Sequence, residues 1–168
     1  MEEKKILRKR LIGKMESLPE KYREEADREI VRQVLALEEF KKARVVFCYV
    51  GVGKEINTWP IIEEGIKQGK TVAVPKCIGK GIMAAYAISG REDLVPSFFG
   101  LLEPQRQEKL ILPAEIDFAL VPCVACNYEG LRLGWGGGYY DRYLANTRFV
   151  KAILCREELI NPDIPGEG

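Results

Sequence analysis

The chain has 168 residues, of which 46% are hydrophobic and 30% are charged, and its formal net charge is +1. This length and composition predict one soluble globular domain spanning residues 1–168. So small a net charge gives no overall field for nucleic acid, and no apolar run is long enough to span a membrane. We therefore expect a cytoplasmic protein without nucleic-acid or membrane partners.

Two helices are predicted before the first strand. Residues 2–16 are charged and helix-forming, with apolar residues at helical spacing. Residues 17–20 interrupt this pattern, and a second helix is predicted from there to about Phe40, since proline suits a first helical turn. The basic residues of the first helix, taken alone, indicate a solvated face.

A β-loop-α-turn-β unit follows. Residues 44–50 form a continuous apolar run, which is typical of a strand buried on both faces. Residues 59–67 predict a helix with Thr58 as N-cap and a proline in the first turn. Residues 71–75 predict a second, parallel strand reached by a right-handed crossover.

The remaining chain continues the alternation of strands and helices. Strands are predicted at residues 82–88, 118–122 and 149–155, and a helix over residues 139–145. This alternation predicts an α/β fold with a mostly parallel central sheet flanked by helices.

Three segments follow the ends of predicted strands. They are residues 51–58, 75–80 and 123–141. Ligands of open α/β sheets bind beyond the carboxyl ends of the strands, so we expect these segments to form one composite site.

Residues 130–142, GLRLGWGGGYYDR, concentrate the polar chemistry of the chain. Glycines at 134 and 136–138 allow consecutive N–H groups to turn toward an anion, and the helix that follows adds partial positive charge. Arg132 and Arg142 add charge suited to phosphate. The aromatic residues interleaved with the glycines favour a phosphate-binding loop over a plain turn. Neither the Walker A nor the dinucleotide pattern is met.

Histidine is absent, which excludes Ser-His and Cys-His dyads, an imidazole base and histidine metal ligands. Catalysis would then use carboxylates, Lys, Arg, Tyr, backbone donors or a metal, an inventory that suits phosphoryl transfer. The five cysteines, mostly inside apolar runs, indicate buried free thiols. Cys123 and Cys126 have CxxC spacing, but without a second CxxC or a histidine a zinc or redox site is disfavoured.

Residues 132–142 resemble the 5-formyltetrahydrofolate cyclo-ligase family, also called methenyltetrahydrofolate synthetases. The family loop reads R-L-G-x-G-x-G-Y-Y-D, and every fixed position is met here. Residues 4–8 look like its K-x-x-L-R motif, residues 54–58 its E-[IV]-x-T segment, and residues 100–104 its G-I-x-E-P stretch. The resemblance covers nearly the whole chain and implies a NagB/RpiA/CoA transferase-like α/β fold. We expect a monomer.

The resemblance implies an ATP- and Mg²⁺-dependent ring closure. 5-Formyltetrahydrofolate and MgATP would give 5,10-methenyltetrahydrofolate, ADP and phosphate. In the implied mechanism the formyl oxygen attacks the γ-phosphate, N10 attacks the activated carbon, and phosphate leaves. ATP is needed because the oxygen of an amide-like formyl group is a poor leaving group until it is phosphorylated.

The resemblance also implies residue roles, which reverse the solvated-face interpretation of the first helix. The ATP-binding residues would be Lys4, Lys5, Ile6, Leu7, Arg8, Arg132, Leu133, Gly134, Trp135, Gly136, Gly137, Gly138, Tyr139 and Tyr140. The folate-binding residues would be Val50, Glu55, Met83, Trp135, Gly136, Gly137, Gly138 and Tyr139, with Glu55 accepting hydrogen bonds from the pterin. Arg132 and Asp141 look like the catalytic residues, and Asp141 and Glu167 like the Mg²⁺ ligands.

Two positions depart from the family pattern. The family's C-terminal D-[IV]-x-x-D has Glu167 here in place of its second aspartate, and residues 126–127 are Cys-Asn where Phe-Asp is usual. The short C-terminal segment and Glu167 motivate an alternative, a non-catalytic nucleotide- or folate-binding module. An isomerase or CoA-transferase-like enzyme is a third alternative, which no constellation of residues supports.

Overall fold

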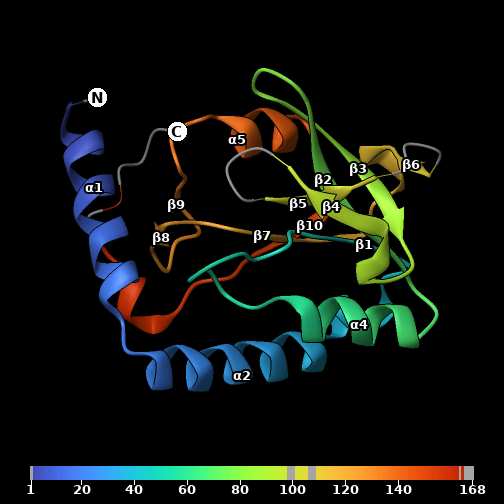
Figure 1. The fold of residues 1–168 in the computed structure, drawn as a ribbon, viewed down its shortest axis with the longest axis horizontal. Helices are drawn as coiled ribbons and strands as arrows, with labels where there is room; N and C mark the ends of the chain where they lie inside the picture. The colour runs from blue at the N-terminus through green and yellow to red at the C-terminus, as the bar shows by residue number, and fades with distance from the viewer. Residues whose placement is uncertain (1, 98–100, 106–108, 163, 165–168) are drawn as a thin grey trace.

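A six-stranded sheet forms the centre of the computed structural model, which describes residues 2–97, 101–105, 109–162 and 164 (Figure 1). The strand order is β10-β7-β1-β2-β3-β6. The strands are β1 (Val45–Cys48), β2 (Thr71–Gly79), β3 (Ile82–Ile88), β6 (Leu110–Ile111), β7 (Phe118–Val121) and β10 (Val150–Ile153). The first four in the sheet are mutually parallel, while β3 pairs antiparallel with both of its neighbours, β2 and β6. The predicted α/β fold with a mostly parallel sheet is confirmed.

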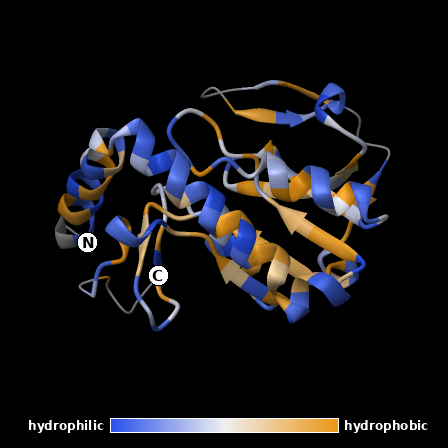
Figure 2. Cartoon of the chain, turned by 90° about the horizontal axis from the view of Figure 1, so that it is seen from below, coloured by the Kyte–Doolittle hydropathy of each residue, from blue (hydrophilic) through white to orange (hydrophobic). Residues whose placement is uncertain are grey.

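The neighbouring strands β1 and β7 carry the most apolar sequences. The residues of β7 are all buried, and so are those of β1 except Val45. Figure 2 shows the sheet as a hydrophobic layer between helices that are partly hydrophilic. Strands covered on both faces cannot alternate apolar and polar residues, which is why both appear in the sequence as continuous apolar runs.

The second strand extends further than predicted. β2 continues to Gly79 and turns back into β3 as an antiparallel hairpin, in which Lys76 pairs with Ala84 and Cys77 with Met83 (Figure 1). The prediction of a loop over residues 75–80 was therefore wrong. Pairing with β3 supplies hydrogen bonds beyond the point where the parallel neighbour β1 ends.

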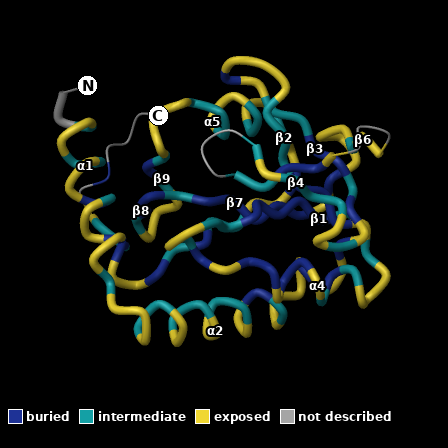
Figure 3. The backbone as a smooth tube through the Cα atoms, viewed as in Figure 1, coloured by how far each residue is buried: buried dark blue, intermediate teal, exposed yellow. Residues whose placement is uncertain are grey.

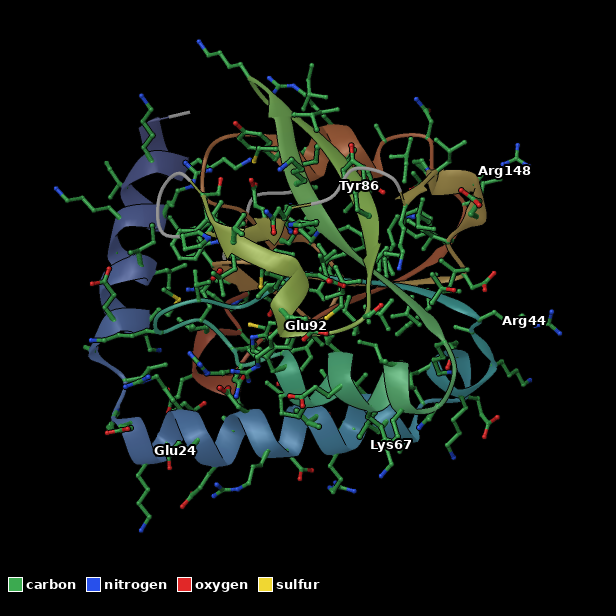
Figure 4. The ribbon with its side chains drawn as sticks, turned by 45° about the vertical axis from the view of Figure 1, so that its right-hand side comes forward. Glu24, Arg44, Lys67, Tyr86, Glu92 and Arg148 are labelled. Carbon is green, nitrogen blue, oxygen red and sulfur yellow. The ribbon has the colours of Figure 1, made fainter. Side chains whose placement is uncertain are left out.

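Helices cover both faces of the sheet. They are α1 (Glu2–Ser17), α2 (Glu20–Ala36), α3 (Glu38–Lys42), α4 (Trp59–Lys67) and α5 (Tyr139–Leu144). Residues of α2, α3 and α4 pack on one face in the largest core cluster, and residues of α5 pack on the other. Buried strands and outward-facing helix surfaces are evident in Figure 3. In Figure 4 the exposed Glu24, Arg44, Lys67 and Arg148 point outward.

Two local predictions about helices need correction. The predicted helix to Phe40 is broken at Leu37, whose backbone is extended, and the break turns the buried Phe40 edge-on to Phe118 at 6.3 Å between ring centroids. Thr58 occupies the N-cap position of α4, but its side chain makes no capping hydrogen bond. Instead its hydroxyl donates to the carbonyl of Tyr49 and accepts from the N–H of Gly51, which fastens the loop to the end of β1.

A separate hydrophobic cluster joins α1 to the rest of the molecule, and we call it the α1 cluster. It consists of Leu11, Met15, Val124, Ala125, Leu133, Leu159 and Ile164. The middle members belong to or adjoin the short hairpin of β8 (Ala125–Cys126) and β9 (Arg132–Leu133), beside which α1 stands in Figure 1. Leu159 ends the 3₁₀ helix η4 (Glu157–Leu159).

The remaining elements are short and lie around the edge of the sheet. They are η1 (Arg91–Asp93), β4 (Leu94–Pro96), β5 (Leu102–Pro104) and η3 (Pro113–Glu115). Within the described part of the chain, no helix combines the length and apolar character needed to cross a membrane.

Candidate functional site

The glycine loop, residues 134–138, connects β9 to α5. The helix after the loop was predicted from the sequence, but the short strand before it was not. Gly136 and Gly138 have φ angles of 105° and 71°, in a region that glycine adopts without the steric cost of a Cβ. Because α5 has only six residues, its dipole adds little, and the loop depends on its own N–H groups and on nearby cations to attract an anion.

Arg8 brings α1 against this loop. Its Nε donates a 2.7 Å hydrogen bond to the carbonyl of Gly134, and its Cζ would lie 3.7 Å from a Cβ at Gly136. Lys4 precedes Arg8 by one helical turn and so lies on the same side of α1. Lys5 and Ile6 are exposed, and Leu7 packs against the α1 cluster. The structure thus brings the two predicted ATP-binding segments together.

Arg132 is fixed by contacts on several sides. Its Nε donates to the carbonyl of Pro122 at 2.9 Å, its Nη1 donates to Asp141 at 3.2 Å, and its Cζ lies 5.5 Å from the centre of the Tyr140 ring. A Cβ at Gly134 would be only 3.1 Å from Nη2, so the guanidinium also faces the glycine loop. The side chain is 12% exposed. This cation is therefore already oriented toward the position where an anion on the loop would lie.

Asp141 stands in the first turn of α5 with a side chain that is 60% exposed. One carboxylate beside the predicted phosphate-binding loop fits Mg²⁺, which commonly takes one or two carboxylates together with phosphate oxygens and water. The other predicted ligand, Glu167, lies outside the described residues.

Arg142 has a different environment from Arg132. Its Nη1 donates to the carbonyls of Gly81, at 3.4 Å, and Gly137, at 3.3 Å. A Cβ at Gly81 would overlap this guanidinium, so the hairpin and α5 are in close contact there. Arg142 braces the glycine loop against the β2-β3 hairpin.

Glu55 lies in the loop that follows β1, beside the end of β7. Its Oε1 accepts a 3.0 Å hydrogen bond from the N–H of Val52. The side chain lines a cavity of about 20 Å³ together with Tyr49, Cys123 and Arg156. Burial raises the pKa of Glu55 above its usual value, against the opposing effects of the Val52 N–H and of Arg156. A partly desolvated carboxylate of this kind is able to accept hydrogen bonds from a ligand.

The other predicted folate contacts surround the same edge of the sheet. Trp135 is 43% exposed, whereas Val50 is buried in the main core. Met83 is half-buried and packs in the cluster on the α5 face. Burial raises the pKa of the Cys77 thiol, Tyr139 lies close enough to oppose this effect slightly, and Cys77 pairs with Met83 across the hairpin.

Glu103 is a residue to which the sequence assigned no role. It is buried, and its Oε2 accepts a 2.9 Å hydrogen bond from the N–H of Cys77. The neighbouring Lys76 donates to the carbonyl of Pro104. The Glu-Pro pair within residues 100–104 was the available signal, but only the fold shows that this carboxylate fastens β5 to the hairpin.

The three predicted segments do meet at one edge of the sheet. Glu55 and Cys123 line one cavity, and Arg142 joins the glycine loop to the hairpin tip. A sheet of this kind, with anion-attracting groups and a half-buried carboxylate beyond its parallel strands, is the arrangement of an α/β domain with a candidate small-molecule site.

The chain belongs to the 5-formyltetrahydrofolate cyclo-ligase family, whose model matches residues 1–168. It is 33% identical over 175 residues to the 5-formyltetrahydrofolate cyclo-ligase of Mycolicibacterium smegmatis, covering 98% of this chain and 87% of that protein. The NMR structure of Aquifex aeolicus 5,10-methenyltetrahydrofolate synthetase superposes with a TM-score of 0.86 at 31% identity, covering 98% and 84%. The synthetase from Mycoplasma pneumoniae, at 23% identity over 92% and 91%, shares the fold with a TM-score of 0.68. The family expected from the sequence, and its enzymatic character, are confirmed.

Proposed function

We propose that this protein converts 5-formyltetrahydrofolate and ATP to 5,10-methenyltetrahydrofolate, ADP and phosphate in a Mg²⁺-dependent reaction. The formyl oxygen would take the γ-phosphoryl group, N10 would attack the activated formyl carbon, and the C–O bond to phosphate would break. We also propose that it acts as a cytoplasmic monomer without a nucleic-acid partner.

The observation that carries this proposal is the convergence of Arg8 and Arg132 on the glycine loop. Arg8 bonds the loop through the carbonyl of Gly134, and Arg132 faces the same glycine while held by Pro122 and Asp141. Phosphoryl transfer gains mainly from positioning and from neutralising charge on the transferred group. Arg132, restrained before the ligand arrives, is suited to that task.

Asp141 and Glu167 would hold Mg²⁺, with Asp141 beside the glycine loop. The bound ion would neutralise charge on the phosphate oxygens. Asp141 itself also restrains Arg132, so it would contribute to the orientation of the phosphate-binding cation.

Glu55 would bind the pterin of the folate by accepting hydrogen bonds from its N–H groups. Its place beside Cys123, at the ends of β1 and β7, supports this role. Trp135, Tyr139 and Met83 would supply apolar and aromatic contacts from the other side of the same edge.

The direct test is to mix the protein with 5-formyltetrahydrofolate and MgATP and follow the near-ultraviolet absorbance of the methenyl product. We expect an increase that depends on ATP. If no product forms while ATP still binds, the chain is a non-catalytic nucleotide-binding module, and the proposed activity is wrong.

Single substitutions separate the residue roles. We expect Arg132→Ala and Asp141→Ala each to lower kcat by about 10²-fold or more, the usual effect of losing a group that stabilises transition-state charge. Glu55→Ala should mainly raise the dissociation constant for the folate. Arg148→Ala is the matched control, since Arg148 is exposed and points away from the molecule (Figure 4). Unchanged folate affinity in Glu55→Ala would remove that assignment.

A further inference from the structure

Three cysteines from two segments converge next to the candidate site. The Sγ atoms of Cys123, Cys126 and Cys155 all lie within 4.8 Å of one another. Cys126 is buried and the other two are half-buried. The CxxC pair alone was too little to indicate a metal site, and the third cysteine is contributed by the fold.

Strand pairing explains why Cys155 arrives there. Val121 of β7 pairs with Ile153 of the parallel strand β10, and Cys123 and Cys155 each follow their paired residue by two positions. The two segments that follow β7 and β10 therefore leave the sheet side by side. Cys126 is fixed nearby at the β8-β9 hairpin, where its carbonyl also accepts the N–H of Asn161 at 2.8 Å.

The arrangement of the three sulfurs matches the demands of a thiophilic ion. Tetrahedral zinc with Zn–S bonds of about 2.3 Å places its sulfur ligands about 3.8 Å apart. A bound ion would replace the protons of the three thiols, as thiolate ligation requires.

A cavity lined by two of the cysteines and by two cationic side chains adjoins the three sulfurs. Cys126 and Cys155 line a cavity of about 500 Å³, to which Arg132 and Lys151 also contribute. Three thiolates and a divalent ion carry one net negative charge, and the two cations that line the same cavity would reduce the cost of that charge. Within the described residues no further Cys, Asp or Glu joins this group of sulfurs.

We propose that Cys123, Cys126 and Cys155 bind one thiophilic divalent cation, Zn²⁺, with a fourth position on the cavity side filled by water or another small ligand. Three protein ligands and one exchangeable position form a recognised zinc arrangement. The site is separate from the Mg²⁺ site of the proposed function and does not depend on turnover. The ion would tie β10 to the β8-β9 hairpin, in which Cys126 pairs with Arg132.

The first test measures Zn²⁺ affinity of the reduced, chelator-treated full chain by competition with a chromophoric chelator. We expect one Zn²⁺ per chain and a loss of affinity of about 100-fold or more in Cys155→Ser, since even outer partners of metal ligands commonly contribute 10–100-fold. Cys77→Ser is the matched control and should bind as the unsubstituted protein does, because Cys77 lies on the β2-β3 hairpin. Equal affinity in Cys155→Ser, or no binding at all, would overturn the proposal.

A second test uses the unsubstituted protein and so does not depend on how well a variant folds. Iodoacetamide labelling is quantified by peptide mass spectrometry with and without Zn²⁺. Zn²⁺ should protect Cys123, Cys126 and Cys155 while Cys77 labels equally in both samples. Co²⁺ in place of Zn²⁺ should give thiolate-to-metal charge-transfer absorption. Labelling unaffected by Zn²⁺ would contradict the site, whether or not the protein turns over folate.

Discussion

At the scale of single residues, Arg132 and Arg142 show how two similar side chains acquire different tasks. Arg132 is held between Pro122 and Asp141 and faces the glycine loop, whereas Arg142 bonds the carbonyls of Gly81 and Gly137. Arg132 is thus a cation held in place beside the candidate anion site, whereas Arg142 restrains the backbone of the glycine loop and the hairpin. We therefore expect catalysis to be sensitive to replacement of the guanidinium by an ammonium, which keeps the charge, only at Arg132.

We predict that Arg132→Lys lowers kcat at least tenfold while leaving the melting temperature nearly unchanged. An ammonium keeps the charge but lacks the planar fork that bonds Pro122 and Asp141 together. Steady-state kinetics and thermal unfolding measure the two quantities, with the exposed Arg148→Lys as control. Full activity in Arg132→Lys would show that charge alone is sufficient.

Glu55, a residue of the candidate site, also affects how the stability of the folded protein depends on pH. Its folded-state pKa is raised by burial above the ordinary value of 4.5, so the folded chain holds this proton more tightly than the unfolded chain. The unfolded state then binds fewer protons, and stability declines as pH rises from about 4.5 through the folded pKa. Above that pH the charged carboxylate carries its full desolvation cost.

We predict that Glu55→Gln increases the free energy of unfolding at pH 7 relative to the unsubstituted protein, and that this gain shrinks toward pH 4.5. Glutamine keeps the size and the acceptor for Val52 without the buried charge. Urea unfolding across this pH range measures the effect, and Glu157→Gln, at an exposed carboxylate, is the control. A gain independent of pH would exclude titration of Glu55 as its cause.

The sequence reveals such residues only in part. The motif at 132–142 identifies which residues gather at the site, because glycines and arginines at fixed spacing carry the family pattern. Charge and spacing alone treat Arg132 and Arg142 alike, and only the family resemblance assigned a catalytic role to Arg132. Their structural partners, Pro122 and Gly81, could not be predicted, because each lies on another element. Glu103 and Cys155 were missed for the same reason, since both depend on strand pairing for their neighbours.

At the scale of elements, α1 completes the candidate site from outside the sheet. Leu11 and Met15 bury its apolar side in the α1 cluster, and Arg8 reaches the glycine loop from there. The helix thus has an anchoring side and a ligand-facing side. These two functions should respond separately to substitution.

We predict that Arg8→Ala lowers kcat/KM about tenfold or more, or about 1.4 kcal/mol, through a higher KM for ATP. The change removes a charged donor from Gly134 but leaves the buried apolar residues of α1 in place. Circular dichroism should show unchanged helix content. The control is Arg10→Ala, at an exposed position of the same helix. Equal losses in the two variants would indicate a general effect of charge.

The elements that could be predicted from the sequence are those with a clear local pattern of apolar residues. β1 and β7 were found because strands buried on both faces are continuous apolar runs. β8 and β9 have two residues each, which is too short to show an alternation of apolar and polar residues, so they were not predicted. The break at Leu37 and the hydroxyl of Thr58 follow tertiary contacts rather than propensity, and the antiparallel return of β3 depends on a hairpin turn.

At the scale of the whole molecule, one buried ion pair connects three distant segments. Arg156, 2% exposed, bonds both carboxylate oxygens of Asp27 on α2 and donates to the carbonyl of Lys54 in the loop that carries Glu55. Asp27 also accepts the N–H of Asn57. The loop after β1 is thus held from two sides.

We predict that Arg156→Met lowers the free energy of unfolding by about 3–5 kcal/mol, the usual cost of leaving one partner of a buried pair uncompensated. Adding Asp27→Asn should recover part of this loss, because it removes the unpaired charge. Urea unfolding of the two variants measures both values. A loss in Arg156→Met below about 1 kcal/mol would mean that water replaces the arginine.

The contact between Arg8 and Gly134 also bears on the order in which the chain folds during synthesis. The two residues are 126 positions apart, and the apolar partners of α1 lie equally far along the chain. At 5–20 residues per second, a ribosome needs on the order of 6–25 s to synthesise the intervening segment. During that interval α1 lacks the apolar residues of the α1 cluster from Val124 onward, while the strands from β1 to β3 are already available to pair. We therefore expect the sheet to form before α1 docks, which makes the candidate nucleotide site among the last parts of a nascent chain to assemble.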